Sequence, residues 1–342
     1  MSLPEAEAIK AEAAGVKRRW WNRVITSEYW VLYLCLVYFV VMCVLAPQVA
    51  SPENVSNVFS NMLPLLIVAV GQTIVLISGG IDLSATSIIA LTSVVGASVM
   101  TGDGGLLAGS ALAVPGGIVA MLLTGALVGL FNGAAITRLQ MPPFIVTLTT
   151  MIFFSGFAIW LTQSSPIYNL PESFILIGKG AFLFVPYALV VALMVVALAH
   201  VALSRMLFGR WLYAAGATAK TALVSGVPVN RTVMTAYVAS GVCAAAASIL
   251  YTGRLETGSP VLGQRILLDV IGAAVIGGTS LFGGKGKVMW TVFGVLFITL
   301  IDNSLNMLEQ PPSYFVIMML KGTVILLAAL LDTMRGRLLI GG

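Results

Sequence analysis

Residues 182–203 read FLFVPYALVVALMVVALAHVAL and contain no Asp, Glu, Lys or Arg. An α-helix rises about 1.5 Å per residue, so about 20 apolar residues cross the hydrocarbon core of a bilayer. Eight more stretches of this kind lie at 29–46, 60–78, 84–100, 112–137, 144–162, 232–252, 287–307 and 314–332. A tenth, 267–281, is shorter and interrupted by glycine. The pattern predicts an all-α, polytopic membrane protein with about ten transmembrane helices, of which the eighth is short and broken.

The composition agrees with a membrane protein. Only 18 Lys and Arg and 13 Asp and Glu occur among 342 residues, so charged residues make up 9% of the chain and apolar residues 59%. Soluble domains carry roughly 25% charged residues. These values exclude a soluble, nucleic-acid-binding or disordered protein. Apolar residues run continuously and do not alternate, which excludes a β-barrel.

The distribution of Lys and Arg predicts the direction of the spans, because short cytoplasmic loops are enriched in both. No Lys or Arg occurs within 24–137, so the basic N-terminal tail and Arg138 lie on one side only if an even number of crossings separates them. The four apolar stretches between them meet this condition. Counting 267–281 as a crossing also places Lys285 and Lys287 inside. We therefore expect both termini in the cytoplasm. The expected parts are an N-terminal tail, a transmembrane domain and a C-terminal tail, at 1–28, 29–334 and 335–342.

Glycines on one predicted span indicate close helix packing. Gly125, Gly129 and Gly133 recur every fourth residue and share one helical face. Small residues let helix backbones approach closely in lipid, where the hydrophobic effect does not drive association. Asn132 lies beside them, and a polar amide in hydrocarbon needs a partner.

Residues 204–231 separate two spans by more than a turn requires. A short helix fits Thr218 to Val224, with Thr218 as N-cap, Gly226 at the C-terminal stop and Pro228 as terminator. A surface helix this short is marginal alone. The segment is therefore either a docking element for a partner or a solvated loop.

Four motifs follow one another along the chain. They are Gly79-Gly80-Ile81-Asp82-Leu83-Ser84; Asn132-Gly133 with 142–148; Gly209-Arg210, Tyr213-Ala214-x-Gly216 and 225–231; and 275–281 with Gly283-Gly284-Lys285-Gly286, Leu305-Asn306 and Lys321-Gly322. In this order, over roughly residues 60–332, they resemble the ribose-type family of ABC sugar-importer permeases. The chain departs from that pattern at Ala85-Thr86 and around 218–220.

The resemblance implies a fold like that of type II, vitamin-B12-importer-like ABC permeases in the bacterial inner membrane. It implies the permease subunit of an ATP-driven importer for a monosaccharide or related polyol, surrounded by the lipid bilayer. The implied partners are a cytoplasmic ABC ATPase dimer, a periplasmic sugar-binding protein and a second permease copy, with a homodimer expected and a heterodimer left open. The implied contacts with the ATPase are Arg210, Gly216, Thr218, Ser225 and Gly226.

The chain has no nucleotide-binding sequence of its own. The run 278–286 lacks Walker A spacing, and Gly286 stands where Ser or Thr should follow the lysine. We therefore expect no enzyme activity and no cofactor, with ATP bound by the partner. Cys35, Cys43 and Cys243 lie in apolar stretches without Cys-x-x-Cys spacing, so no metal site or disulfide is expected.

Charged residues inside spans are expensive and need partners. Asp82 is expected to cap the helix that starts near Leu83 or Ser84 and to belong to a gate, and Asp269 to cap the eighth span. Asp302 and Lys321 form either a structural ion pair or part of a hydrated passage. The candidate pathway residues are Asp82, Ser84, Asn132, Thr147, Asp269, Asp302, Asn303, Asn306 and Lys321.

Two other classes compete with the importer subunit. A proton-coupled secondary transporter could use Asp82, Asp302 and Lys321 as relay groups. An intramembrane enzyme has less support, because the spans contain no paired carboxylates or His/Asp/Cys cluster. A secondary transporter also has no need of the long basic loop at 204–231.

Overall fold

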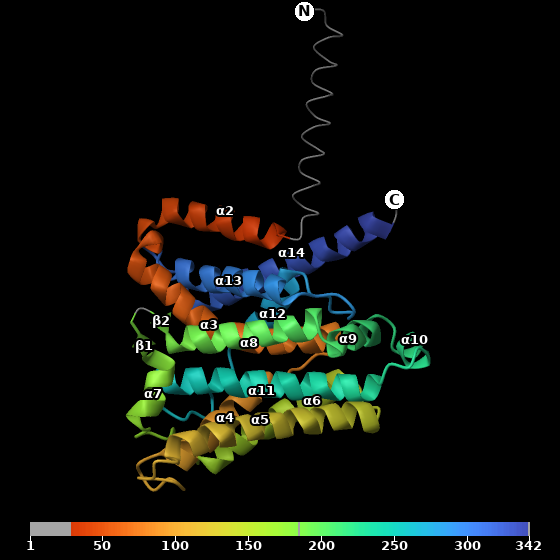
Figure 1. The fold of residues 1–342 in the computed structure, drawn as a ribbon. Helices are drawn as coiled ribbons and strands as arrows, with labels where there is room; N and C mark the ends of the chain where they lie inside the picture. The colour runs from red at the N-terminus through yellow and green to blue at the C-terminus, as the bar shows by residue number, and fades with distance from the viewer. Residues whose placement is uncertain (1–28, 184, 341–342) are drawn as a thin grey trace, which may run out of the picture.

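The computed structural model describes residues 29–183 and 185–340, and within them the chain is a helical bundle (Figure 1). Its helices are α2 (Trp30–Leu45), η1 (Pro47–Ala50), α3 (Pro52–Ile77), α4 (Ala85–Met100), α5 (Ala113–Arg138), α6 (Pro143–Leu161), α7 (Glu172–Lys179), α8 (Tyr187–Ser204), α9 (Leu207–Ala217), α10 (Ala219–Val224), α11 (Val229–Leu255), α12 (Leu267–Gly277), α13 (Val288–Leu305) and α14 (Tyr314–Ile340). Strands β1 (Ala181–Phe182) and β2 (Val185–Pro186) pair antiparallel. The predicted tail at 1–28 and the last two residues lie outside the described ranges.

Each of the ten predicted apolar stretches contains a helix. Six of these helices, α3, α5, α6, α8, α11 and α13, are long and apolar enough to cross a membrane. The other four, α2, α4, α12 and α14, are apolar helices with shorter described lengths. This composition is that of a polytopic membrane protein.

Two helices begin at least five residues away from the predicted starts. Helix α3 begins at Pro52, ahead of the apolar stretch, because the Ser51 hydroxyl accepts a hydrogen bond from the Asn54 amide and Pro52 occupies the first turn. Helix α8 begins only at Tyr187, because the β1–β2 hairpin takes up the start of the apolar stretch. Hydropathy alone does not mark either boundary.

Helix α12 is the predicted short eighth element. It has 11 residues, which correspond to about 16 Å at 1.5 Å per residue. Gly278 ends it with a φ of 108°, a left-handed conformation that glycine adopts without strain. The helix alone is therefore about half as long as the hydrocarbon core is thick.

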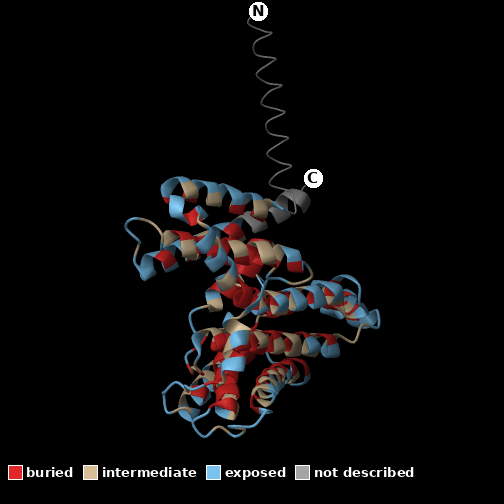
Figure 2. Ribbon diagram, turned by 60° about the vertical axis from the view of Figure 1, so that its left-hand side comes forward, coloured by how far each residue is buried: buried red, intermediate tan, exposed pale blue. Residues whose placement is uncertain are grey.

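Helix α3 is the centre of the bundle. In its most apolar window 89% of the residues are buried, compared with 22% in α6 and in α8. Figure 2 shows buried residues concentrated in the middle of the fold and exposed residues on the outer helices. The exposed faces of α6 and α8 are apolar, which suits contact with lipid or with another membrane subunit.

The glycine face predicted on α5 is confirmed as a packing surface, and its partner is α11. A Cβ added at Gly125 would lie 2.4 Å from the Gly241 carbonyl oxygen, and one added at Gly129 would lie 2.4 Å from the Tyr237 carbonyl oxygen. Gly133 packs in the same way on Met234. No larger side chain fits at these positions without separating the two helices.

The two ends of the bundle are distinct. Helix α7 and the β1–β2 hairpin lie at one end, which we call the hairpin end, and α9 and α10 project at the other, the α10 end (Figure 1). Helix α3 connects them. The Gln48 side chain, just before α3, donates to the Met307 carbonyl oxygen, and Ile77, the last residue of α3, meets α9 through Gly216. The 26 residues of α3 span about 39 Å.

Residues 204–231 form two helices, of which the sequence predicted the second, α10. Gly226 has a φ of 81° and its amide donates to the Leu223 carbonyl oxygen, which confirms the predicted stop. Thr218 occupies the predicted N-cap position, but its hydroxyl donates to the Ala217 carbonyl oxygen and caps no amide. Helix α9 was not predicted, because its 11 residues are too few to cross a membrane and mix Gly, aromatic and basic types.

Candidate functional site

A buried polar cluster surrounds Asp82 in the loop between α3 and α4. Asp82 is 1% exposed, and its Oδ1 accepts hydrogen bonds from the Ser84 amide at 2.9 Å and the Ser84 hydroxyl at 2.6 Å. Its Oδ2 accepts from the Ser240 hydroxyl of α11 at 2.7 Å. The Asn132 amide of α5 donates to the Ser84 Oγ at 2.8 Å. We call Asp82, Ser84, Asn132 and Ser240 the Asp82 cluster.

The predicted N-cap role of Asp82 holds only in part. Helix α4 begins at Ala85 with Ser84 in the N-cap position, one residue later than expected. Asp82 still accepts the Ser84 backbone N–H, so it satisfies one donor at the start of the helix. Its other oxygen joins the loop to α11 instead. The carboxylate therefore fixes the loop to two helices as well as starting one.

The same loop is held through the Ile81 carbonyl oxygen. It accepts a hydrogen bond from the Thr147 hydroxyl of α6 at 3.1 Å and from the Tyr237 hydroxyl of α11 at 3.4 Å. A Cβ at Gly80 would lie 2.3 Å from the Tyr237 hydroxyl oxygen. Helices α5, α6 and α11 thus all anchor the loop 79–84, and any movement of this loop must involve them.

Four glycines from three motifs meet at the α10 end, and we call them the glycine junction: Gly79, Gly216, Gly283 and Gly284. A Cβ at Gly216 would lie 1.8 Å from the Ile77 carbonyl oxygen and 2.7 Å from the Gly284 amide nitrogen. A Cβ at Gly283 would lie 2.6 Å from the Gly216 carbonyl oxygen and 2.8 Å from the Gly79 Cα. The Gly284 amide donates to the Ile77 carbonyl oxygen at 2.9 Å. The end of α3, the α9 segment and the loop 279–286 therefore touch backbone to backbone.

Tyr213 reinforces this junction from α9. Its hydroxyl donates to the Gly286 carbonyl oxygen at 2.7 Å, and burial raises the pKa of the phenol above its usual range. The phenol therefore remains a neutral donor at physiological pH. Helix α9 therefore contacts the end of α3 and the loop 279–286 directly, through backbone atoms and through the Tyr213 side chain.

A second polar cluster, which we call the Lys321 cluster, joins α12, α13 and α14. The Lys321 ammonium lies 2.9 Å from Asp269 Oδ1 and 2.7 Å from Asp302 Oδ2. The Lys321 and Asp269 side chains are only 11% and 12% exposed, whereas that of Asp302 is 42% exposed. The Asp302–Lys321 ion pair, one of the two alternatives that the sequence left open, is formed, and the second carboxylate gives the cluster a formal charge of −1.

The predicted capping role of Asp269 is wrong. Ile266 holds the N-cap position of α12 and no side chain caps the helix. Asp269 lies in the first turn, but its carboxylate binds the Lys321 ammonium with both oxygens, at 2.9 and 3.0 Å. A buried ammonium attracts the carboxylate more strongly than a backbone amide does.

Two further predicted residues, Asn303 and Asn306, take no part in the ion pairs of the Lys321 cluster. The Asn306 amide donates to the Asp302 carbonyl oxygen of its own helix at 2.6 Å. The Asn303 Oδ1 and the Asn132 Oδ1 are buried without a hydrogen-bond partner among the described residues. These unpaired oxygens can accept a hydrogen bond from water or from a hydroxyl group of a solute.

The structure separates the predicted pathway residues into two sets at opposite ends of α3. Asp82, Ser84, Asn132 and Thr147 meet near the α10 end, and Asp269, Asp302 and Lys321 meet near the hairpin end. Sequence reasoning missed Ser240 and Tyr237, because single polar residues in an Ala-rich helix carry no signal of their partner. The Asp269–Lys321 pair could have been found by seeking a second buried charge for Lys321.

Helix α10 exposes apolar side chains at its end. Leu223 is 65% exposed and Val224 is 90% exposed, and Arg210 of α9 is also exposed. A short helix with exposed Leu and Val gains little from its own fold. Its exposed face is therefore available to a partner.

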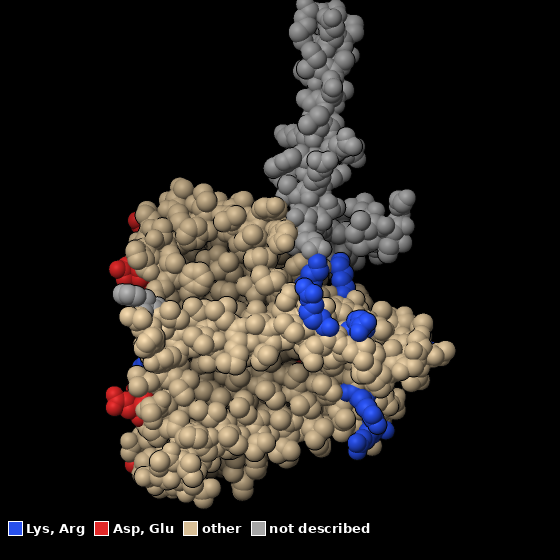
Figure 3. Space-filling view, in the orientation of Figure 1, with Lys and Arg blue, Asp and Glu red and all other residues tan. Residues whose placement is uncertain are grey.

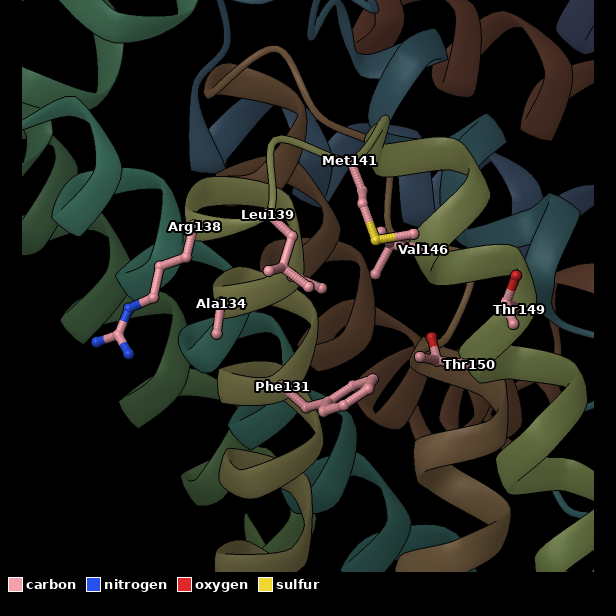
Figure 4. Close-up of a pocket in the computed structure, with 9 residues that line it drawn as sticks. Phe131, Ala134, Arg138, Leu139, Met141, Val146, Thr149 and Thr150 are labelled. Atoms are coloured by element: carbon pink, nitrogen blue, oxygen red, sulfur yellow. The ribbon is translucent and has the colours of Figure 1, made fainter.

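The groove between α5 and α6 does not suit a polar solute (Figure 4). It has a volume of about 380 Å³, and Phe131, Leu139, Met141 and Val146 line it. The hydroxyls of its two threonines donate to carbonyl oxygens of their own helix. The Arg138 side chain points away from the other labelled residues (Figure 4).

No metal site is formed within residues 29–183 and 185–340, where no group of three or more His, Cys, Asp or Glu side chains could hold an ion. Cys35, Cys43 and Cys243 are free thiols, and the first and last are buried.

The fold and its two buried polar clusters define a polytopic helical permease. Over residues 54–329 the chain matches the family described as "Branched-chain amino acid transport system / permease component", and it belongs to this family. It is 36% identical over 299 residues to the ribose import permease protein of Bacillus subtilis (strain 168), covering 86% of this chain and 89% of that protein.

The names of two other relatives specify different sugars. The chain is 29% identical over 326 residues to the D-allose transport system permease protein of Escherichia coli (strain K12), covering 95% of this chain and 97% of the relative. It is 29% identical over 332 residues to the L-arabinose ABC transporter permease protein of Azospirillum brasilense, covering 97% of this chain and 94% of that relative. No solved structure matches the chain.

Proposed function

We propose that this chain is the permease subunit of an ATP-driven ABC importer that moves a monosaccharide or related polyol into the cell. The glycine junction carries this proposal, because it joins the α9–α10 segment to the loop that holds the Asp82 cluster. The names of the relatives support a sugar as substrate, since they specify ribose, D-allose and L-arabinose. ATP binds to a separate subunit.

The proposed topology has ten crossings, both termini in the cytoplasm and the α10 end facing the cytoplasm, as in type II ABC permeases. Figure 3 supports this direction: most visible Lys and Arg side chains lie towards the α10 end, and most visible Asp and Glu side chains lie along the opposite edge. Lys and Arg favour the cytoplasmic side of a bilayer. Helix α12 then crosses together with the loop 278–287, since the helix alone is too short.

In the proposed mechanism, the ATPase moves α10, and α9 conveys that movement through the glycine junction to the loop 79–84. The loop holds Asp82, so the Asp82 cluster acts as an inner gate that opens when its hydrogen bonds to α5 and α11 rearrange. Arg210, Gly216, Thr218, Ser225 and Gly226 form or support the contact with the ATPase. Contacts between packed backbones transmit displacement because interiors are dense.

The Lys321 cluster is the proposed outer gate. It joins three helices near the periplasmic end, and the 42% exposed Asp302 side chain gives it access to water. The orphaned Asn132 and Asn303 oxygens offer weak hydroxyl partners along the route. Weak partners suit passage better than retention, so a periplasmic binding protein supplies the affinity.

The complete importer contains a cytoplasmic ABC ATPase dimer, a periplasmic binding protein and a second permease copy, which we propose to be identical. Exposed apolar residues on α10 support docking of the ATPase. The exposed apolar residues on the outer faces of α6 and α14 are available for contact with a second membrane subunit. Together the two permeases enclose the route.

Reconstitution tests this function. Proteoliposomes with this chain, its ATPase and its binding protein should take up a radiolabelled monosaccharide only with ATP on the ATPase side, and a protonophore should have no effect. A panel of D-ribose, D-allose and L-arabinose identifies the substrate. Uptake that persists without ATPase and collapses with the protonophore would instead establish a proton-coupled transporter.

A further inference from the structure

A hollow at the hairpin end of α6 combines features of a sugar site. It has a volume of about 590 Å³ and is lined by Gly156, Ile159, Trp160, Leu161, Gln163 and Ser164. The hollow is open to solvent, and like many ligand sites it combines apolar and aromatic walls with a few polar groups. None of these six residues belongs to the Asp82 or the Lys321 cluster.

Aromatic rings lead along α6 into this hollow. Trp160 is 71% exposed, and its ring centroid lies 5.8 Å from that of Phe157 with an angle of 20° between the planes. Phe157 and Phe153 are related in the same way, at 6.2 Å and 10°. Residues three and four apart share one face of a helix. Sugar rings present C–H groups on one face, and these pack on exposed aromatic rings.

Polar groups lie at the rim of the hollow. Gln163 and Ser164 adopt left-handed conformations, with φ of 50° and 65°, and their amides donate to the Trp160 and Ile159 carbonyl oxygens. Neither side chain has a hydrogen bond within the part of the chain that the structure describes. An amide and a hydroxyl are therefore available beside the Trp160 ring, as recognition of a polyhydroxylated ligand requires.

Gly156 keeps the hollow open. A Cβ at this position would meet nothing within 4 Å, so the glycine serves neither helix packing nor a left-handed turn. A larger side chain would fill space without disturbing the fold. This makes Gly156 a site at which the hollow can be closed by substitution.

We propose that this hollow is a weak receiving site for a monosaccharide at the periplasmic mouth of the permease. Trp160 stacks on the apolar face of the sugar, and Gln163 and Ser164 bind its hydroxyl groups. An aromatic anchor for the lipid interface needs neither the hollow nor the two free polar side chains. The inference rests on the proposed import function and specifies where the solute first meets this chain.

Sugar uptake by the reconstituted importer tests whether the Trp160 ring stacks on the sugar. Trp160→Leu should lower monosaccharide uptake about two- to tenfold, which is the range expected for loss of one aromatic stacking contact, while Trp160→Phe should keep most of it. Gly156→Leu should lower uptake at least as much. Ala197→Leu, which adds bulk on the exposed face of α8, is the matched control and should leave uptake unchanged.

Protection from labelling tests occupancy directly. In the complex carrying Cys43→Ala and Ser164→Cys, a maleimide should react more slowly in the presence of D-ribose, D-allose or L-arabinose at tens of millimolar than with betaine at equal osmolality. Adding Trp160→Leu should abolish that protection.

Normal uptake by both Trp160→Leu and Gly156→Leu, or equal labelling with sugar and betaine, would overturn the receiving site. In either case ATP-driven uptake by the unsubstituted importer would leave the proposed function standing. Loss of assembly with Trp160→Leu, together with full uptake by Gly156→Leu, would identify a subunit or lipid contact and also overturn the site. Absence of uptake by the unsubstituted importer would instead refute the function.

Discussion

At the residue scale, Asp82 and Lys321 are both buried charges, and the chain satisfies them by different means. Asp82 receives hydroxyl and amide hydrogen bonds, whereas Lys321 binds two carboxylates. Hydroxyl donors can rotate away at modest cost, but a buried ion pair is costly to break. The Asp82 cluster is therefore the easier of the two to rearrange during transport.

Lys321→Met should destabilise the protein by roughly 3–5 kcal/mol, because Asp269 would remain buried without its cation. Asp302→Asn should cost much less, since the Asp302 side chain is 42% exposed. Thermal unfolding in detergent measures both. The double variant Asp269→Asn/Lys321→Met should regain much of the loss, and equal stability of Lys321→Met and the unsubstituted protein would contradict a structural role of the cluster.

The partners of charged residues could be predicted from the sequence only where two charges lay in neighbouring apolar stretches. Asp302 and Lys321 meet this condition, and their ion pair was one of the two alternatives that the sequence left open. Asp269 was assigned to a helix cap, because a carboxylate in a first turn has a local explanation and its true partner lies far along the chain. Ser240 and Tyr237 act on the loop 79–84 across the bundle, and no local pattern marks them.

At the scale of elements, the glycine junction explains why three separate motifs contain glycine. Gly79, Gly216 and Gly283 let α3, α9 and the loop 279–286 meet at backbone distance. The sequence predicts helices of nearly correct length and the close packing of α5, but it does not predict that α9 meets these two loops. Hydropathy fixes the apolar spans, whereas contacts between loops depend on how the spans pack.

Gly216→Ala should uncouple ATP hydrolysis from transport. The added Cβ would lie 1.8 Å from the Ile77 carbonyl oxygen, so α9 must move away from α3. The reconstituted importer should keep hydrolysing ATP while sugar uptake falls at least about tenfold, a change of about 1.4 kcal/mol in effective barrier. Gly322→Ala, where a Cβ meets nothing within 4 Å, is the control. Normal uptake by Gly216→Ala would show that the junction does not transmit the movement.

The paired substitution Leu223→Asp/Val224→Asp should release the ATPase subunit. Both side chains are exposed, so the permease should stay folded while an apolar docking surface becomes charged. Co-purification from detergent measures the complex. Leu183→Asp, at a position 79% exposed at the opposite end, should leave it intact. Retention of the ATPase by the paired variant would exclude α10 as the docking element.

At the scale of the whole molecule, the buried charged residues fall into two separate clusters, around Asp82 and around Lys321, in a bundle whose centre is helix α3. Between Asn54 and Ile77 this helix contains no charged residue, so a chain of titratable groups along it is absent. The proposed gates, which a partner moves, need no relay of titratable groups along this helix. In the proposed importer, the exposed apolar faces of α6 and α14 contact lipid or the second membrane subunit.

The most direct test of the central claim is the side of the membrane on which α10 lies, and whether the ATPase covers it. Single cysteines, Val224→Cys and Leu183→Cys, are introduced with Cys43→Ala, since Cys35 and Cys243 are buried. An impermeant maleimide applied to spheroplasts should label Leu183→Cys alone. In inverted vesicles it should label Val224→Cys, and bound ATPase should block that reaction. Labelling of Val224→Cys from the periplasmic side, or labelling unaffected by the ATPase, would contradict the account.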